Sequence, residues 1–338
     1  MLFPFETLRA IVGGASAIDV PRLRLNDLDD AEGFLDCYGF SWADPADRED
    51  LEQVRTSALA FLRNVLLEPG EVVHPEIAAE QDVRALLLRV SSDDTSRERL
   101  WACALLRVMH TFAHARSDLS ERYAEAIEAQ ILGRFQAHLR EEDGGLWLGD
   151  LPLVAFEARA RKPIDSIVLK LLHKPENVAA DVFDRLGVRF VTRSRLDALL
   201  VVRFLRKNNV VMFANVKPSR SKNTLVDLDA VERAFATDPD LESLRIEMQR
   251  WPYPTRPEDS ANPHSSRVYH AIQFTGRQRV RVDDGGRPLR FFFPFEVQVL
   301  DEDAYVTSRA GYASHEEYKA RQRQAARRRV LPGLINRW

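Results

Sequence analysis

The stretch FFFPFEVQVL, residues 291–300, decides the architecture of the second half of the chain. Its end alternates polar and apolar side chains, as a β-strand with one covered face does. Glu296 and Gln298 fall on one side of this strand, and Val297 and Val299 fall on the other. A glutamate in so apolar a strand is costly to bury unless it binds a metal ion or another cation. On this stretch alone, a strand whose polar face meets solvent is the simpler interpretation.

Around this stretch, β-rich runs and helical runs follow one another in an order typical of a sheet with helices packed upon it. The predicted strands are 147–158, 186–192, 209–216, 268–276, 277–282 and 289–300, and the predicted helices are 165–173 and 195–207. The sequence DDGG at 283–286 predicts a hairpin turn between the last two strands. Residues 146–338 are therefore expected to form an α+β domain with a mixed sheet.

The first 145 residues predict a separate, all-helical domain whose role the sequence does not reveal, because apolar side chains recur there at spacings of three and four residues. His110 and His114 stand one helical turn apart in this half. Such a pair can bind zinc, but no third ligand is near, so we interpret both as core or surface histidines.

Composition narrows the class of protein. The formal net charge of −3 provides no overall field that would attract an anionic partner, so anion binding must come from local clusters. Two distant cysteines, Cys37 and Cys103, indicate a reducing compartment. The chain has no apolar run of 18 residues, and its first residues lack the basic start of an export signal. We expect a cytoplasmic protein without a membrane partner.

The richest local cluster is RARKPIDSIVLK, residues 159–170. A strand is predicted to end here and a helix to begin, with Lys162 before the helix and Lys170 one turn beyond Ser166 on the same face. Helix N-terminal amides, a hydroxyl and two ammonium groups together suit a polyphosphate. The alternative is an ordinary solvated helix start with Ser166 as its cap.

A second cluster is DRLGVRF, residues 184–190, in which Asp184 precedes a strand and Arg189 lies within it. Alternation places Gly187 and Arg189 on one face. An arginine inside a strand needs a partner, which is Asp184 or another carboxylate if its role is structural. If Glu296 lies at a sheet edge beside Asp184, the two carboxylates would form a Mg²⁺ site.

These strings, in this order, resemble the synthetase domain of the RelA/SpoT alarmone enzymes. KPIDSIVLK at 162–170 is similar to the family's basic, Ser-Ile and Lys motif, DRLGVRF to its Asp-x-x-Gly-x-Arg strand, and FEVQV at 295–299 to its Glu-x-Gln strand. YHAIQF at 269–274 resembles its tyrosine segment. The resemblance covers about residues 146–325 and implies a nucleotidyltransferase-like catalytic domain that moves pyrophosphate from ATP to a nucleotide 3′-hydroxyl.

The resemblance also implies roles for single residues. The donor ATP would be held at its phosphates and adenine by Arg161, Lys162, Ser166, Lys170 and Arg189. Asp184 would bind Mg²⁺, and Glu296 would complete the metal site or deprotonate the attacking hydroxyl. The acceptor, GDP or GTP in this family, would meet Tyr269, Gln273 and Gln298.

Departures from the family pattern gather on the acceptor side, where Gln273 replaces a histidine and Leu300 replaces an arginine. On the donor side, the family's first arginine falls on Ala160, so Arg159 or Arg161 would take its place. Two other hypotheses therefore stay open. One is pyrophosphate transfer to another acceptor, an adenine nucleotide or the 3′ end of tRNA, and the other is a catalytically silent nucleotide-binding module.

Two further basic segments invite alternative interpretations. Lys217, Arg220 and Lys222 would either contact phosphates or form a solvated loop. The basic helix predicted at 316–329 would either meet nucleic acid or be a solvated terminal helix, and we favour the second.

Overall fold

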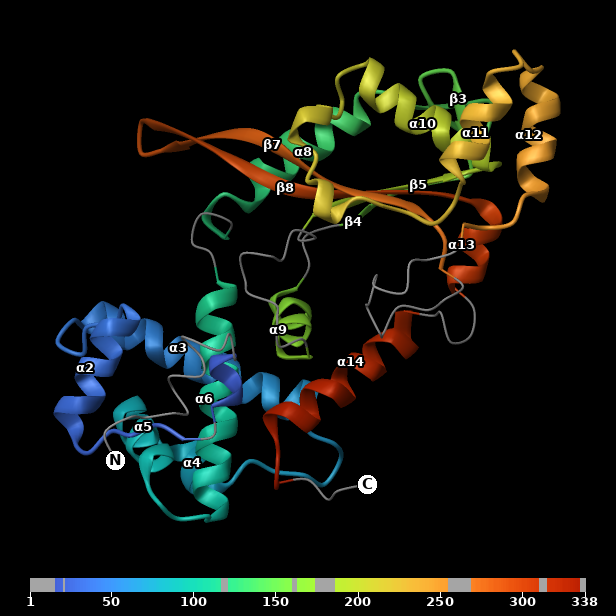
Figure 1. Ribbon diagram of the computed structural model, residues 1–338. Helices are drawn as coiled ribbons and strands as arrows, with labels where there is room; N and C mark the ends of the chain where they lie inside the picture. Colours follow the sequence, from blue (N-terminus) through green and yellow to red (C-terminus); the bar gives the residue numbers. More distant parts are fainter. Residues whose placement is uncertain are drawn as a thin grey trace. The chain divides into compact units, whose positions relative to one another are not determined.

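The computed structural model describes residues 16–20, 22–116, 121–159, 163–173, 186–254, 269–309 and 315–334. The chain divides into two compact units. The helical unit comprises Met1–Ser117, Pro163–Asp181 and Ala320–Trp338, and the sheet unit comprises Asp118–Lys162 and Val182–Lys319. Figure 1 shows their elements in sequence colours.

The helical unit is built from amphipathic helices that begin at side-chain caps. Its main helices are α2 (Leu28–Tyr38), α3 (Pro45–Phe61), α4 (Pro75–Ala79), α5 (Val83–Ser91), α6 (Arg97–Ala115), α9 (Ile164–His173) and most of α14 (His315–Val330). Asp27, Asp44, Asp82 and Ser96 each accept a hydrogen bond from a backbone N–H of the first helical turn. These caps satisfy donors that have no partner within the helix.

The compact units differ from the ranges predicted from the sequence, which divide the chain once at residue 145. Helix α9 belongs to the helical unit because its apolar residues, among them Ile167 and Leu171, are buried there against α6. Helix α8 (Ala124–Gln136) belongs to the sheet unit, where Ile127, Ile131 and Phe135 join the core. Sequence order alone cannot reveal such an exchange.

The basic C-terminal helix is not the solvated helix that the sequence predicts. Arg327 is 2% exposed, and its guanidinium donates to both carboxylate oxygens of Glu71 at 2.8 and 2.9 Å. Arg329 donates to Asp19 and to the backbone oxygen of Leu172. Part of the positive charge of α14 is thus used inside the helical unit rather than offered to a partner.

The sheet unit contains a small three-stranded meander and a mixed five-stranded sheet among its described residues. The meander is β1 (Leu139–Glu142), β2 (Gly145–Leu148) and β3 (Leu151–Leu153). The larger sheet has the order β4 (Ala155–Arg159), β5 (Gly187–Thr192), β8 (Arg287–Asp301), β7 (Ile272–Asp284) and β6 (Lys222–Asn223). Strands β5 and β8 are parallel, and the other neighbours are antiparallel.

One face of the larger sheet carries the core of the sheet unit. Val188 and Phe190 of β5 and Val297 and Val299 of β8 are at most 2% exposed on this face. Helices α8 and α10 (Arg195–Lys207) cover it, as Figure 1 shows. The remaining helices of the unit are α11 (Leu228–Phe235), α12 (Leu241–Arg250) and α13 (Glu302–Arg309). The alternation of apolar residues in β5 and β8 is thereby confirmed.

Four expectations about strands need correction. Residues 147–158 were expected as one strand but are divided among β2, β3 and β4. Residues 209–216 form no strand, because Asn209 takes a left-handed conformation (φ 55°) and the N–H groups of Val210 and Val211 bond back to Leu205. Residues 268–276 and 277–282 were expected as two strands, but β7 runs unbroken through Ile272–Asp284. Strand β8 lies in the middle of the sheet, so Glu296 does not stand at an edge.

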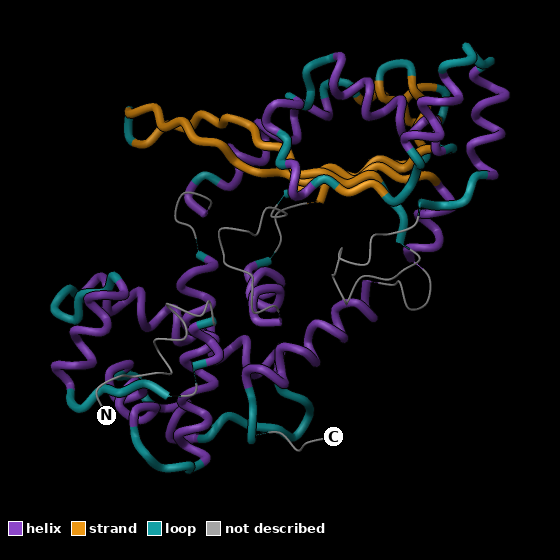
Figure 2. The backbone as a smooth tube through the Cα atoms, in the orientation of Figure 1, coloured by secondary structure: helices purple, strands orange, loops and turns teal. Residues whose placement is uncertain are grey.

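The predicted hairpin turn is confirmed. Gly285 and Gly286 have φ values of 60° and 88° and join β7 to β8. Two positive φ values in a row are typical of a two-residue hairpin loop, and glycine adopts them without strain. Figure 2 shows the two strands as one long ribbon.

No described helix is long and apolar enough to cross a membrane.

Candidate functional site

A row of polar residues crosses the second face of the five-stranded sheet. Cross-strand register places Glu157, Arg189, Gln298, Gln273 and Lys222 opposite one another on β4, β5, β8, β7 and β6. Residues directly opposite share a face of the sheet. We call these five residues the polar row. Its members come from five separate stretches of sequence.

Arg189 is the centre of the row. Its Nη1 donates to Glu157 Oε2 at 3.0 Å, while Nε and Nη2 donate to Gln298 Oε1 at 3.1 and 3.0 Å. The Arg189 side chain is 13% exposed and that of Glu157 is 32% exposed. Arg189 therefore has the carboxylate partner that an arginine in a strand requires, and this partner comes from β4.

Glu296 lies in the next row of the same face. It pairs in register with Gly187 on β5 and Thr275 on β7, and Gly187 in turn pairs with Arg159 on β4. Gly187 is buried, and a Cβ there would stand 3.3 Å from the backbone oxygen of Glu296 and 3.6 Å from its Cβ, so the two strands approach closely at this position. The register places Arg159 on the other side of Gly187.

The Glu296 carboxylate is buried, with 8% of the residue exposed, and two amides hold it. Gln298 Nε2 donates to Oε2 at 2.7 Å, and Gln273 Nε2 donates to Oε1. A carboxylate offers about four lone-pair sites. These two bonds, one on each oxygen, use part of that capacity and fix the orientation of the carboxylate.

Two tyrosines extend the network. Tyr269 donates its hydroxyl to Gln298 Oε1 at 3.2 Å, on the oxygen that also faces Arg189. Tyr305 of α13 donates to Glu157 Oε1. This bond to the Glu157 carboxylate, together with burial, raises the pKa of the Tyr305 hydroxyl above its ordinary value. Tyr305 therefore acts as a hydrogen-bond donor at neutral pH.

The structure brings together five of the residues that the sequence singles out. Arg189, Tyr269, Gln273, Glu296 and Gln298 lie on the sheet unit and are connected by the bonds described above. Glu157 and Tyr305 were not predicted as site residues from the sequence. Glu157 was detectable in principle, since it is a charged residue near the end of the strand predicted at 147–158. Tyr305 had no signal, because only the turn after β8 brings it to Glu157.

Of the remaining predicted residues, two belong to the helical unit and three lie outside the described residues. Ser166 and Lys170 are partly exposed on α9, one turn apart as predicted, in the helical unit. Helix α9 begins at Ile164, so Ser166 lies within its first turn and is not the cap. Arg161, Lys162 and Asp184 lie outside the described residues. Among the described residues, no three His, Cys, Asp or Glu side chains are grouped as a protein-only metal site requires.

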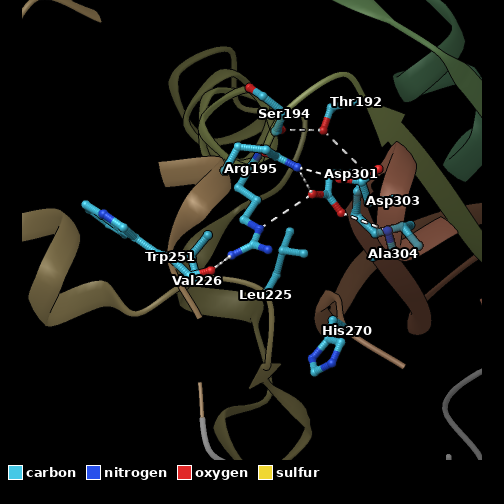
Figure 3. Close-up of polar contacts among 12 residues, drawn as sticks. Thr192, Ser194, Arg195, Leu225, Val226, Trp251, His270, Asp301, Asp303 and Ala304 are labelled. Carbon is cyan, nitrogen blue, oxygen red and sulfur yellow. Dashed lines mark hydrogen bonds and ion pairs between the residues drawn. The ribbon is translucent and has the colours of Figure 1, made fainter. Parts of the chain in front are cut away.

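A second polar cluster lies at the ends of β5 and β8, and Figure 3 shows it. Arg195 Nε stands 3.6 Å from Asp301 Oδ2, and Arg195 Nη1 donates to the backbone oxygen of Trp251 at 2.6 Å. The guanidinium also lies 3.9 Å from the ring centre of Tyr253. Gln249 Nε2 donates to Asp301 at 2.9 Å. We call these residues the Arg195 cluster; it fastens α10, α12 and β8 together.

The histidine pair of α6 is in contact with Tyr38 of α2. Tyr38 of α2 is hydrogen-bonded to His110 Nδ1, and its ring also contacts His114. Burial and the nearby His114 lower the pKa of His110 to about 4. His110 is therefore neutral at physiological pH and belongs to the packing between α2 and α6, in agreement with the interpretation as a core histidine.

This chain has only distant similarities to known proteins. No family model matches the chain, and no curated protein matches it either. Among solved structures, small alarmone synthetase 1 from Bacillus subtilis is 12% identical, with a TM-score of 0.31, over 63% of this chain and 91% of that one. Small alarmone synthetase 2 from the same organism is 14% identical, with a TM-score of 0.29, over 62% and 86% of the two chains.

A GTP pyrophosphokinase family protein from Streptococcus pneumoniae is also similar, with 15% identity and a TM-score of 0.27 over 60% of this chain and 80% of that one. At TM-scores of 0.27 to 0.31, these likenesses decide neither the fold nor the activity of this chain. Its function has to be inferred from the residues of the polar face.

Proposed function

We propose that this protein transfers pyrophosphate from ATP to the 3′-hydroxyl of a guanine nucleotide in a Mg²⁺-dependent reaction. The observation that carries this proposal is the register of β5 and β8, which sets Arg189 beside Gln298 and Gly187 beside Glu296. The three residues expected to meet donor, acceptor and reacting hydroxyl thus share one face of one sheet. An amphipathic strand facing solvent would not need the buried, doubly amide-bonded carboxylate.

The proposed reaction is an in-line displacement at the β-phosphorus of ATP. The acceptor 3′-oxygen forms a bond to that phosphorus, the bond between it and the α–β bridging oxygen breaks, and AMP leaves with the electron pair. Glu296 takes the hydroxyl proton. Gln273 and Gln298 keep the carboxylate pointing at the hydroxyl and would orient the acceptor.

Arg189 is proposed to lie against the adenine of ATP, as the motif resemblance implies. Its guanidinium is planar and is held by Glu157 and Gln298, so little side-chain entropy remains to be lost on stacking. By the motif resemblance, Lys162, Ser166 and Lys170 stay candidates for binding the donor phosphates, with Arg159 or Arg161 as a further cation; Ser166 and Lys170 belong to the helical unit. The position of Arg159 in register with Gly187 favours Arg159 for this part.

The carboxylate of Glu296 has the chemistry of a magnesium ligand. Mg²⁺ is commonly bound by one or two carboxylates plus substrate phosphates and water, and the carboxylate of Glu296 is a ligand of that kind. Asp184 would be the second carboxylate. The ion would supply charge neutralisation for the phosphates. Because ATP and Mg²⁺ are abundant in the cytoplasm, we propose that compartment as the site of action.

Tyr269 is proposed to stack on the acceptor base. Its hydroxyl is tied to Gln298 Oε1, which fixes one edge of the ring and leaves its position coupled to that of Arg189. Because Gln273 stands where the family pattern has a histidine, a second candidate function stays open. It is transfer of pyrophosphate to an adenine nucleotide or to the 3′ end of tRNA, with the same donor chemistry.

The proposal is tested with γ-³²P-ATP, Mg²⁺ and a panel of acceptors: GDP, GTP, AMP, ATP and tRNA. We expect AMP to form in equal amount to a labelled guanine nucleotide, and no AMP when EDTA removes the metal. Label in tRNA or in an adenine nucleotide would replace the acceptor but keep the reaction. Formation of ADP would indicate phosphoryl rather than pyrophosphoryl transfer and would overturn the proposal. Nucleotide binding without turnover would indicate a silent nucleotide-binding module.

A further inference from the structure

The hairpin of β7 and β8 extends beyond the rest of the five-stranded sheet as a two-stranded ribbon. From Arg277 and Pro294 onward these strands pair with each other up to Asp284 and Arg287. Figure 2 shows the ribbon projecting from the sheet. Its inner face is packed: Val280 and Phe293 belong to the core of the sheet unit.

The outer face of the ribbon is strongly basic. Alternation along β7 places Arg277, Arg279 and Arg281 on the side that also carries Gln273 and Thr275, and Arg290 of β8 lies directly opposite Arg281. All four arginines are exposed. None of them forms an ion pair with a carboxylate in the described part of the chain. We call these four residues the arginine face.

This concentration of charge has a cost that packing does not explain. Arg281 and Arg290 are a like-charge pair directly across two strands, which destabilises a sheet. Asp283, the carboxylate nearest the turn on this face, accepts a hydrogen bond from Gly286 N at 2.9 Å and serves the turn. Four positive charges therefore face one negative charge, although the whole chain has a net charge of −3. A binding role for the arginines accounts for the excess.

The ribbon is held in place with this face outward. The free edge of β7 is capped at Arg281, whose N–H donates to Gln130 Oε1 at 3.0 Å and whose carbonyl accepts from Gln130 Nε2 at 2.8 Å. Gln278 Nε2 donates to the backbone oxygen of Gln130 at 3.0 Å. Helix α8 thus fixes the middle of β7, so the arginine face is a built surface rather than a set of charges on a loop.

An aromatic ring lies among the arginines. Phe292 is 46% exposed and stands directly opposite Arg279. The guanidinium of Arg277 lies 5.2 Å from its ring centre. Guanidinium groups spaced about 6.5 Å apart along a strand can follow the phosphates of an extended chain, and an exposed ring with an adjacent guanidinium offers a stacking surface for unpaired bases.

We propose that the arginine face and Phe292 bind a single-stranded nucleic acid. Positive charge in a line with an interleaved aromatic ring is the combination that proteins use for single strands, where bases are free to stack. An acidic protein partner would use the charge but not the ring. A duplex hides its bases from the ring. The proposal stands independently of pyrophosphate transfer, since it needs only binding.

The experiment measures fluorescence anisotropy of a labelled single-stranded RNA of about 20 nucleotides, a length that exceeds a typical single-strand site. We expect binding whose logarithmic salt dependence approaches a slope of about −2.8, that is about −0.7 for each of four arginines. The variant R279Q/R281Q should bind at least about 10-fold more weakly, with the slope reduced by about 1.4. The matched control R203Q/R233Q removes two exposed arginines from α10 and α11 and should bind as the wild type does.

Phe292→Leu separates stacking from charge. It should weaken binding about 5-fold or more while leaving the salt slope unchanged. The same single strand of DNA, a duplex and poly-glutamate are measured in parallel. Equal loss in both double variants, no binding of any single strand, or tighter binding of the duplex or of poly-glutamate would each overturn the proposal. Circular dichroism melting of every variant checks that the exposed substitutions leave the fold intact.

Discussion

The polar row and the Arg195 cluster both join an arginine to a carboxylate within the sheet unit, yet solvent reaches them to different extents. In the Arg195 cluster, the side chains of Arg195 and Asp301 are 7% and 0% exposed, and backbone and ring atoms close around them. In the polar row, the side chains of Arg189 and Glu157 are 13% and 32% exposed. The first pair is enclosed, and the second is open along one side.

This difference separates structural polarity from functional polarity. A buried ion pair whose atoms are used by neighbouring elements fixes how those elements join, and removing one partner leaves an uncompensated charge. A row of polar groups on a sheet face, fixed by one another but still open, has hydrogen-bonding capacity left for a ligand. The expected consequence is that substitutions in the Arg195 cluster cost stability, whereas those in the polar row cost binding and activity.

The largest expected effect is on the closed cluster. Asp301→Ala should lower the free energy of unfolding by about 3–5 kcal/mol, because Arg195 keeps its charge in a buried place. Urea unfolding followed by circular dichroism measures this. Asp303→Ala is the control; Asp303 is exposed and also accepts from Gln249, and its loss should cost under about 1 kcal/mol. Equal effects of the two variants would remove the distinction between closed and open polarity.

The second expected effect is the pH dependence of stability that His110 of the helical unit causes. The pKa of His110 is lowered to about 4 by burial, so between pH 6.5 and 4 the unfolded chain binds a proton that the folded chain does not. Stability should therefore fall as the pH falls through this window, by about 3 kcal/mol in total. Unfolding of wild type and His110→Gln at pH 7, 5.5 and 4.5 isolates this contribution.

We expect the stability difference between wild type and His110→Gln to shrink as the pH decreases, since only the wild type loses the contribution of a neutral imidazole. A difference that stays constant from pH 7 to pH 4.5 would contradict the placement of His110 in the packing of α2 and α6.

A smaller effect is expected at the centre of the polar row. Arg189→Lys keeps the charge but loses the planar guanidinium, so the dissociation constant for Mg²⁺ and a non-hydrolysable ATP analogue should rise about 10-fold, or about 1.4 kcal/mol. Calorimetry measures the affinity, and Arg203→Lys on α10 is the control. If the affinity does not change, Arg189 does not contact the donor. If the melting temperature falls sharply instead, the row is structural like the Arg195 cluster.

The smallest expected effect concerns the outer end of the row. Tyr305→Phe removes the hydrogen bond to Glu157 and should cost about 0.5–1 kcal/mol of stability. Its effect on ATP affinity should be under about 2-fold, because Tyr305 meets Glu157 rather than Glu296. A loss of affinity above 10-fold would place Tyr305 in direct contact with the nucleotide and enlarge the site toward α13.

The sequence was sufficient for those features that depend on local pattern. Alternation identified β5 and β8 and the sides on which Arg189 and Glu296 lie, and DDGG located the hairpin turn. It was not sufficient for features that depend on which strands become neighbours. Nothing in the sequence pairs Glu157 with Arg189, because that contact follows from the register between β4 and β5.

The errors have the same origin. Residues 209–216 have the composition of a strand, but the backbone groups of Val210 and Val211 are already used to end α10. The C-terminal arginines look solvated in sequence, yet Arg327 finds Glu71 far away along the chain. In each case, a hydrogen bond or ion pair that forms only in the folded chain outweighs the structure that the local sequence favours.

The most direct test of the account compares Glu296→Gln with Glu302→Gln, an exposed glutamate in the first turn of α13. Formation of AMP from ATP with Mg²⁺ and the best acceptor is measured for both, beside their melting temperatures. We expect Glu296→Gln to form AMP at least about 10²-fold more slowly while melting at a temperature close to that of the wild type. Glu302→Gln should match the wild type in both rate and melting temperature. Wild-type AMP formation by Glu296→Gln would contradict the account.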